Sequence, residues 1–149
     1  MSFDDAKKKA FRCLEKRDYG RDEMARKLRE KGESEADSAA AADYLVELGL
    51  IDDKRYAAQV VRHYAAKGCG AGRIKGELAR RSLPRELWDE ALEELPASDE
   101  TIDRLLRARL RGDFDQKAVK RASDALLRRG FSWEEIRAAL ARAKAEIED

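Results

Sequence analysis

Histidine and cysteine, on which many metal centres and nucleophilic sites depend, are nearly absent from this sequence. The only histidine is His63, and the two cysteines, Cys13 and Cys69, lie far apart and form no CxxC pair. This set provides neither a zinc site of known ligand spacing nor an acid–base pair of two imidazoles. Two isolated thiols fit a reducing compartment better than a disulfide. We therefore expect no metal and no cofactor.

Long apolar runs are also missing. No stretch approaches the roughly 20 apolar residues that a membrane-spanning helix needs, and the N-terminal MSFDDAKKKAF is charged too early to be a signal peptide. Aromatic residues make up only 7% of the chain, whereas 42% of the residues are charged. Few bulky side chains and many charges favour a thin, extended structure over a thick core. We expect a soluble cytoplasmic protein without membrane association.

Residues that oppose helix formation are scarce. The two prolines, Pro84 and Pro96, fall where a helix could begin or end, and Ala, Leu, Glu, Lys and Arg dominate the composition. Apolar positions recur at helical spacing, and no stretch alternates at period two. The sequence predicts an all-α fold of about nine helices, at residues 4–17, 21–31, 35–48, 52–67, 71–82, 84–95, 99–111, 116–129 and 133–147.

Glycine marks the ends of these predicted helices. Many helices close with a residue in the left-handed conformation, which glycine adopts without a Cβ penalty. Five glycines stand directly after a predicted helix: Gly32, Gly49, Gly68, Gly112 and Gly130.

The helical pattern repeats about every 48 residues. IKGELARRSLPRELWDEAL, which begins at Ile74, aligns with ASDALLRRGFSWEEIRAAL, which ends at Leu140, and MARKLREKG, from Met24, aligns with the start of both. Repeats of this length are typical of stacked helical arrays. We predict an elongated, curved array of three tandem three-helix repeats, helix-turn-helix-like units that span residues 1–50, 51–97 and 98–149.

The net charge of +1 hides a strong segregation of charge. Residues 33–53 hold seven acidic side chains and no basic one, and residues 86–103 hold eight acidic and no basic. Between them, residues 54–81 hold eight Lys or Arg against the single Glu77. Stacked repeats would line up the basic helices, so the sequence predicts a positive track with a negative flank.

In the stretch KGCGAGRIKGEL, residues 67–78, glycines occupy three of the five positions 68–72, directly ahead of what reads as a helix. Glycine-rich turns before helices can cradle phosphates. Here, however, Glu77 stands where a Walker loop needs lysine, and the glycines follow a helix rather than a strand. We therefore predict a structural role, with a helix cap at Gly68 and a sharp turn into a helix that begins near Ala71.

Cys69 lies near His63, which raises the alternative of an enzyme with a thiol nucleophile. The two residues straddle the end of a predicted helix, no third group orients them, and the carboxylates occur in runs typical of a solvated face. Asp52 and Asp53 are predicted to cap the next helix and to place charge in its first turn. We expect His63 to be a partly buried helix residue and the chain to have no catalytic site.

Binding to an anionic surface is the function that this charge pattern favours. Arg55 and Arg62 are seven positions apart and share one helix face, and the next helix carries cations around a core seam of Ile74 and Leu78. Nucleic-acid phosphate or an acidic protein groove would fit. No helix arranges Asn, Gln and Arg to read base edges. The predicted binding residues are Arg55, Arg62, Lys67, Arg73, Lys75, Arg80 and Arg81.

GLIDDKRYAAQVVRHYAAKGCGAGRIKGEL, residues 49–78, resembles the signature of the RecX family of regulatory proteins. It holds that family's Gly-Leu-x-Asp-Asp turn, aromatic-Ala pair, Lys-Gly-x-Gly and Arg-Ile-x-x-Glu-Leu. FRCLEKRDYGRDEMARKLREKG and LLRRGFSWEEIRAAL resemble the first and third units of the family, so the likeness covers nearly the whole chain. The signature positions, expected to be mainly structural, are Gly49, Asp52, Asp53, Tyr56, Ala57, Gly68, Gly70, Ile74, Leu78, Gly130 and Phe131.

The resemblance implies a bacterial protein of three tandem three-helix repeats that binds the RecA recombinase in the groove of its filament on DNA. Such proteins restrain ATP hydrolysis, strand exchange and co-protease activity in recombination, repair and the SOS response. We expect a monomer, and the resemblance allows contact with single- or double-stranded DNA. The alternative is a sequence-tolerant DNA-binding helical repeat protein without a recombinase partner. The sequence departs from the family at Gly20, Met24 and Ser82, where a capping Ser, a Leu and a Gly are usual.

Overall fold

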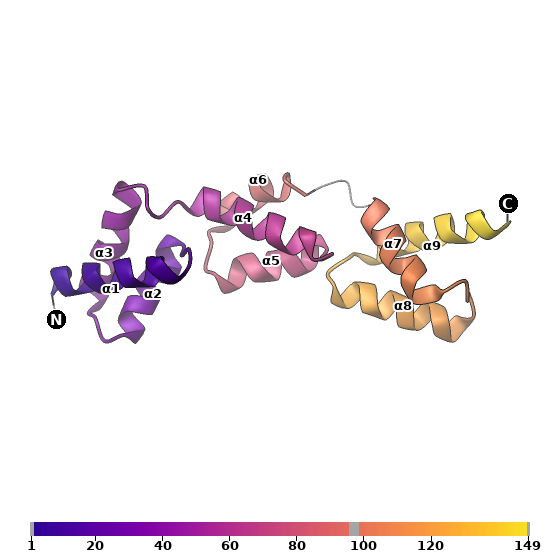
Figure 1. Ribbon diagram of the computed structural model, residues 1–149, viewed down its shortest axis with the longest axis horizontal. Coiled ribbons are helices and arrows are strands. Elements are labelled where there is room, and N and C mark those ends of the chain that lie inside the picture. The colour runs from indigo at the N-terminus through magenta and orange to yellow at the C-terminus, as the bar shows by residue number, and fades with distance from the viewer. Residues whose placement is uncertain (1, 96–98, 149) are drawn as a thin grey trace. The chain divides into compact units, whose positions relative to one another are not determined.

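The computed structural model describes residues 2–95 and 99–148 (Figure 1). Within these ranges the regular structure is entirely helical, with nine α-helices, one short 3₁₀ helix and no strand, which confirms the predicted all-α fold. The elements are α1 (Phe3–Lys16), α2 (Arg21–Glu30), α3 (Glu35–Glu47), α4 (Asp53–Ala66), α5 (Ala71–Arg80), η1 (Arg85–Leu87), α6 (Trp88–Leu92), α7 (Asp99–Leu110), α8 (Gln116–Arg128) and α9 (Trp133–Glu148).

The predicted helix ranges agree with the observed bounds to within one or two residues, except in the segment 84–95. That segment begins as the single 3₁₀ turn η1 and continues as the short α6. The indole N–H of Trp88 donates to the carbonyl oxygen of Leu83 at 2.9 Å, which ties this tight turn to the chain that precedes it. Pro96 and the predicted repeat boundary between residues 97 and 98 lie outside the described residues.

The chain divides into two compact units. The first consists of Met1–Val60 with Glu77–Ala91, and the second of Val61–Gly76 with Leu92–Asp149. Each unit is described by itself below. The division into three repeats stays a prediction.

In the first unit, α3 packs against both α1 and α2. The N-termini of α1 and α3 are capped by serines, since Ser2 Oγ accepts from the N–H of Asp5 at 3.2 Å and Ser34 Oγ accepts from the N–H of Asp37 at 3.0 Å. Small alanines let these helices approach closely around a few larger apolar side chains. The core cluster consists of Ala6, Ala10, Cys13, Tyr19, Met24, Ala25, Leu28, Ala41, Ala42, Leu45 and Ile51.

In the second unit, α7 packs against α8 and α9. The guanidinium of Arg142 on α9 forms a bidentate pair with the carboxylate of Asp103 on α7, with contacts of 2.8 and 3.1 Å. Asp115 caps α8, because its Oδ1 accepts from the N–H of Ala118 at 2.7 Å. The core cluster consists of Ile102, Leu106, Leu110, Ala122, Leu126, Phe131, Ile136, Ala139 and Ala143.

All five glycines predicted to close helices have left-handed backbone conformations, which confirms that prediction. Among the described residues, two with a side chain share this conformation, Ser82 with φ +54° and Arg111 with φ +51°. A Cβ in the left-handed region costs about 1–2 kcal/mol. Ser82 therefore carries a local strain that glycine, usual at this position of the family signature, would relieve.

Candidate anion-binding surface

The glycine-rich turn before α5 is bonded to the loop between α8 and α9, within the second unit. The N–H of Gly70 donates to the carbonyl oxygen of Arg129 at 2.7 Å, and the N–H of Gly72 donates to the carbonyl oxygen of Gly130 at 3.0 Å. In the opposite direction, the guanidinium of Arg129 donates to the carbonyl oxygen of Lys67 at 3.1 Å. Two amides at the start of α5 are thus already bonded to protein, so they are not free to cradle a phosphate.

Missing Cβ atoms make this contact possible. A Cβ on Gly70 would lie 2.6 Å from backbone atoms of Gly130 and Phe131, and a Cβ on Gly130 would lie 2.2 Å from the backbone nitrogen of Arg73. Gly70 does not have a positive φ, so proximity alone requires glycine there. We call this contact the glycine junction, defined by Gly70, Gly72 and Gly130. The sequence predicted the cap at Gly68 and the start of α5 at Ala71 but not the junction.

An open pocket of about 570 Å³ lies beside the glycine junction. Its lining includes Arg73 and Lys75 of α5, Leu127 and Arg128 at the end of α8, and one acid, Glu135 of α9. The sequence had nominated Arg73 and Lys75. Arg128 was missed because it lies more than fifty positions further along the chain, where no local pattern links it to α5.

The three cations of this pocket are available to a ligand. Arg73, Lys75 and Arg128 are exposed, and none of them forms an ion pair within residues 2–95 and 99–148. Leu127 beside them is 43% exposed, which adds an apolar contact to a cationic one. A concave surface on which these three cations, without ion pairs in the described residues, outnumber one acid, Glu135, presents a net positive field to an approaching anion.

Two further nominated cations belong to the same unit. Arg62 on α4 lies 3.7 Å from the carboxylate of Glu94, and both side chains are about half exposed. Such a surface pair contributes at most about 1 kcal/mol, so Arg62 can exchange Glu94 for another anion at little cost. Lys67 is exposed, with its ammonium group 5.6 Å from the ring centroid of Tyr64.

Arg80 and Arg81, in the first unit, are held by a buried acid on their own helix. The Glu77 carboxylate lies 3.4 Å from a guanidinium nitrogen of Arg80 and 3.5 Å from one of Arg81, and its side chain is only 4% exposed. Arg81 also donates to the carbonyl oxygen of Glu77 at 2.9 Å. An ion pair with a buried carboxylate costs much more to break than a surface pair. These two arginines therefore have a structural task that the other nominated cations lack.

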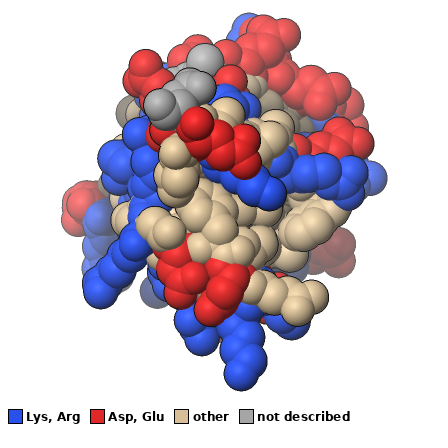
Figure 2. Space-filling view, turned by 90° about the vertical axis from the view of Figure 1, so that its right-hand side faces the viewer, with Lys and Arg blue, Asp and Glu red and all other residues tan. Residues whose placement is uncertain are grey.

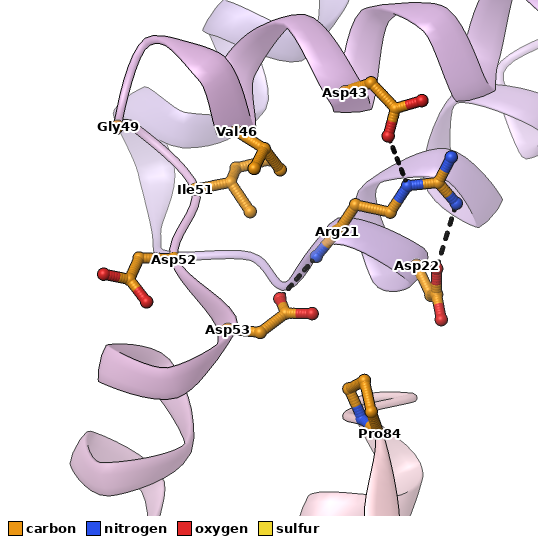
Figure 3. Close-up of a pocket in the computed structure, with 9 residues that line it drawn as sticks. All are labelled: Arg21, Asp22, Asp43, Val46, Gly49, Ile51, Asp52, Asp53 and Pro84. Atoms are coloured by element: carbon orange, nitrogen blue, oxygen red, sulfur yellow. Dashed lines mark hydrogen bonds and ion pairs between the residues drawn. The ribbon is translucent and has the colours of Figure 1, made fainter. Parts of the chain in front are cut away.

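Arg55 and the two aspartates of the family signature meet at the start of α4, in the first unit. Asp52 Oδ1 accepts from the N–H of Arg55 at 3.1 Å, which confirms Asp52 as the cap of α4. Asp53 instead reaches the start of α2, where its Oδ1 accepts from the N–H of Arg21 at 2.8 Å (Figure 3). The Arg55 side chain is exposed.

The Asp53 contact explains why glycine is found at position 20. Gly20 is the N-cap of α2 and has no side chain to bond the first amides, so the carboxylate of Asp53 takes over that task. A Cβ at Gly20 would lie 3.1 Å from Asp53 Oδ1 and 3.2 Å from a methyl carbon of Leu83. The departure from the usual capping serine is thus compensated from another part of the same unit.

Two carboxylates of this site have pKa values that shift in opposite directions. The side chain of Arg21 points at Asp43 and Asp22, at 2.8 and 3.0 Å (Figure 3). The hydrogen bond from Arg21 lowers the pKa of Asp43 below its usual value, whereas burial raises the pKa of Asp53. The pocket that these residues line is therefore a helix-capping site whose acids already serve the protein.

The remaining signature residues serve packing. Ala57, Ile74 and Leu78 are fully buried and Phe131 is 4% exposed. The phenol oxygen of Tyr56 lies 3.3 Å from a guanidinium nitrogen of Arg17. These positions hold the helices that carry the exposed cations and do not themselves offer a reactive group.

Cys69 and His63, the two residues of the thiol alternative, differ in their exposure. Cys69 is a free, half-buried thiol, and His63 is exposed, so the prediction that His63 is partly buried was wrong. His63 stacks edge-on against Tyr64 at 4.9 Å at the surface, because the helix turns this position away from the apolar stripe. Among the residues that the structure describes, no cluster of three potential metal ligands occurs, and no helix is both long and apolar enough to cross a bilayer.

Acidic and basic side chains are both abundant on the face drawn in Figure 2. Many acidic ones lie toward the upper right, others lie at the lower centre and left margin among basic ones, and an uncharged area lies near the centre.

Comparison with known proteins gives the chain a family. Residues 52–92 match the model of the second three-helix domain of RecX. Regulatory protein RecX of Chromohalobacter salexigens is 35% identical over 136 residues, 90% of each chain, and that of Xanthomonas axonopodis pv. citri is 37% identical over 134 residues, 88% of this chain and 83% of the relative. The crystal structure of RecX from Lactobacillus salivarius, 22% identical, has the same fold with a TM-score of 0.85 over 96% of this chain and 97% of that one. The chain belongs to the RecX family of regulatory proteins.

Proposed function

We propose that this protein regulates the RecA recombinase by binding its filament on DNA, where it restrains ATP hydrolysis, strand exchange and co-protease activity. Membership of the RecX family supports the partner. The mode of binding rests on one observation: Arg73, Lys75 and Arg128 line one pocket, exposed and without ion pairs in the described part of the chain. The partner surface is accordingly an acidic, partly apolar strip.

The pocket suits binding better than catalysis. Cations without partners steer an anionic surface toward themselves and fix its register, while a single exposed pair contributes at most about 1 kcal/mol. Several such contacts, together with the exposed Leu127, are needed for a stable complex. A regulator of this kind changes the activity of a filament by binding one filament geometry more tightly than another.

The proposal also covers the repeat organisation, the oligomeric state, the location and the further contact residues of the protein. We propose three tandem three-helix repeats, at residues 1–50, 51–97 and 98–149, that act as a monomer in the bacterial cytoplasm. Arg62 and Lys67, which are exposed and belong to the same unit as the pocket, extend the contact beyond it, and Arg55, exposed on the first unit, stays a predicted contact. Regulation through contacts requires no cofactor and no reaction centre.

The test reverses charge in the pocket. The variant Arg73→Glu/Lys75→Glu/Arg128→Glu should lose inhibition of RecA ATPase on single-stranded DNA, with at least a tenfold higher concentration needed for half inhibition, because three attractions become repulsions. The control Lys117→Glu/Arg121→Glu reverses two exposed cations of α8 that do not line the pocket. Full inhibition by the folded triple variant, checked by circular dichroism, would reject the assignment of this surface.

Sequence-tolerant DNA binding without a recombinase partner is the second candidate, because phosphates would also satisfy the three pocket cations. Affinity for bare strands would then fall steeply with salt, with a logarithmic slope of about −0.7 for each phosphate contacted on a single strand. Titration of the protein onto bare single strands and onto RecA filaments separates the two candidates. Equal affinity for both, with no effect on ATPase, would favour DNA binding alone.

A further inference from the structure

A second cationic pocket lies in the first unit, and none of its cations lines the pocket beside the glycine junction. It has a volume of about 460 Å³ and is lined by the second half of α1 and the end of α2. Four cations line it: Arg12 and Lys16 from α1, Lys27 from α2, and Lys31, which directly follows α2. A single carboxylate, that of Glu15, accompanies them. The pocket therefore carries a formal charge of about +3, from four cations and one acid.

The spacing of these cations is unfavourable unless something neutralises them. Arg12 and Lys16 stand four positions apart on α1, and Lys27 on α2 stands four positions before Lys31, which directly follows that helix. Like charges at this spacing repel and destabilise a helix. None of the four forms an ion pair among the residues that the structure describes.

Neighbouring cations of the same unit are treated differently. Lys9 pairs with the buried Glu33 at 2.9 Å, and Arg17 pairs with Glu23 at 3.3 Å. Arg21 likewise binds two aspartates. These three cations are thus paired, whereas the four that line the pocket are not; Lys8 and Arg29 of the same unit also have no ion pair among the described residues, but they do not line the pocket.

Two buried residues that line the pocket strengthen the electric field of its four cations. Cys13 and Tyr19, which lie at the floor, are 5% and 7% exposed. Arg17 covers the Tyr19 ring, with its guanidinium carbon 3.7 Å from the ring centroid. A weakly polar, water-poor floor beneath several cations screens their charge less than open solvent does.

We propose that this pocket, formed by Arg12, Lys16, Lys27 and Lys31, binds closely spaced phosphate groups. Four cations around a small concavity match several negative charges in a compact group, and phosphate supplies such charge together with strong acceptor oxygens. The phosphates can belong to a nucleic-acid strand or to a free polyphosphate chain. The site lies wholly in the first unit and does not depend on the RecA assignment.

The test titrates two probes onto the full-length protein: inorganic tripolyphosphate and a short oligothymidine. Backbone amide NMR signals of residues 12–19 and 27–31 should shift with each bound probe. The variant Lys16→Gln/Lys31→Gln should weaken binding at this pocket roughly tenfold or more, and reduce the salt slope for the strand by about 1.4, or 0.7 for each lost contact. The control Lys8→Gln/Arg29→Gln removes two exposed cations of the same unit outside the pocket and should change neither value.

Each outcome decides the proposal. Shifts at these residues with oligothymidine alone identify a nucleic-acid strand as the source of the phosphates, and shifts with tripolyphosphate alone identify a free polyphosphate. Shifts with both probes support a general phosphate site. No shift with either probe, shifts confined to other residues, or equal loss in the pocket variant and the control would overturn the proposal. Loss of RecA inhibition in the Arg73 variant with normal shifts here would leave this site standing.

Discussion

Replacing Gly130 with alanine should be among the most damaging single-methyl changes that this protein can suffer. A Cβ at this position would lie 2.2 Å from the backbone nitrogen of Arg73 and 2.5 Å from its Cβ, and backbone atoms cannot move aside as a flexible side chain can. The positive φ of +97° adds about 1–2 kcal/mol of strain for any residue with a side chain. Separating the two segments would also break the bonds of 2.7 and 3.0 Å made by Gly70 and Gly72, at about 1 kcal/mol each. We expect a total loss of about 3–5 kcal/mol in the free energy of unfolding of the second unit.

Two other glycines separate the steric part of this loss from the backbone strain. Gly112 lies in the same unit with φ +78°, and Gly32 has the same φ of +97°, but a Cβ at either would meet nothing within 4 Å. Gly112→Ala and Gly32→Ala should therefore cost only about 1–2 kcal/mol. Gly70→Ala, with no positive φ but a contact of 2.6 Å, should show the steric part alone. Urea unfolding followed by circular dichroism measures all four, and a Gly130→Ala variant no less stable than Gly112→Ala would mean that the glycine junction does not form.

Substitutions at three further positions, Asp53, Ser82 and Gly76, test individual local contacts and conformations. Asp53→Ala should cost about 1 kcal/mol, because the N–H of Arg21 loses its partner. Asp53→Asn keeps an acceptor for this N–H but does not titrate. Because burial raises the pKa of Asp53, the folded wild type takes up a proton more readily than the unfolded chain, so it should gain stability relative to Asp53→Asn as the pH falls through that raised pKa. Thermal melts between pH 3 and 7 check this sign. Ser82→Gly should raise the free energy of unfolding by about 0.5–1 kcal/mol, because relief of the left-handed backbone strain exceeds the loss of one exposed hydrogen bond from Arg26. An unchanged urea midpoint would contradict this expectation. Gly76→Ala, in the open middle of α5, should stabilise by about 0.5–1 kcal/mol in the same assay, and a loss of stability would show a contact at that position that the structure lacks.

The helices could be predicted from the sequence because their ends are set locally. Ser34 accepts from an amide three residues on, and glycines at positions such as 49 and 112 take the left-handed conformation that closes a helix. Such signals need no knowledge of the rest of the fold. The segment 84–95 was drawn too long, because it opens with the 3₁₀ turn η1 and α6 already ends at Leu92, where a turn follows in which the N–H of Leu95 donates to the carbonyl oxygen of Leu92 at 3.0 Å.

The candidate site could be predicted only in part. Counting charges pointed to Arg73 and Lys75, but the same count grouped them with Arg80, whose spacing from Glu77 already matched a pair on one helix face. That part of the error was avoidable. Arg128 was not predictable in this way, since its proximity to Lys75 depends on the packing of α5 beside the end of α8.

A glycine without a positive φ is the most informative of the signals that the sequence held. Gly68 alone supplies the left-handed residue that closes α4, so no helix end requires glycine at positions 70 and 72. Glycine at such positions indicates that another group approaches the backbone closely. From the sequence, that partner could be a phosphate or another stretch of chain, because both approach glycine for the same steric reason. Gly20 repeats the pattern, with the carboxylate of Asp53 and the side chain of Leu83 in the place that its own Cβ would crowd. Gly76 is the exception, since it has no positive φ and a Cβ there would meet nothing within 4 Å. A glycine that no helix end requires therefore indicates a close approach at three of these four positions, and only the fold says what makes the approach.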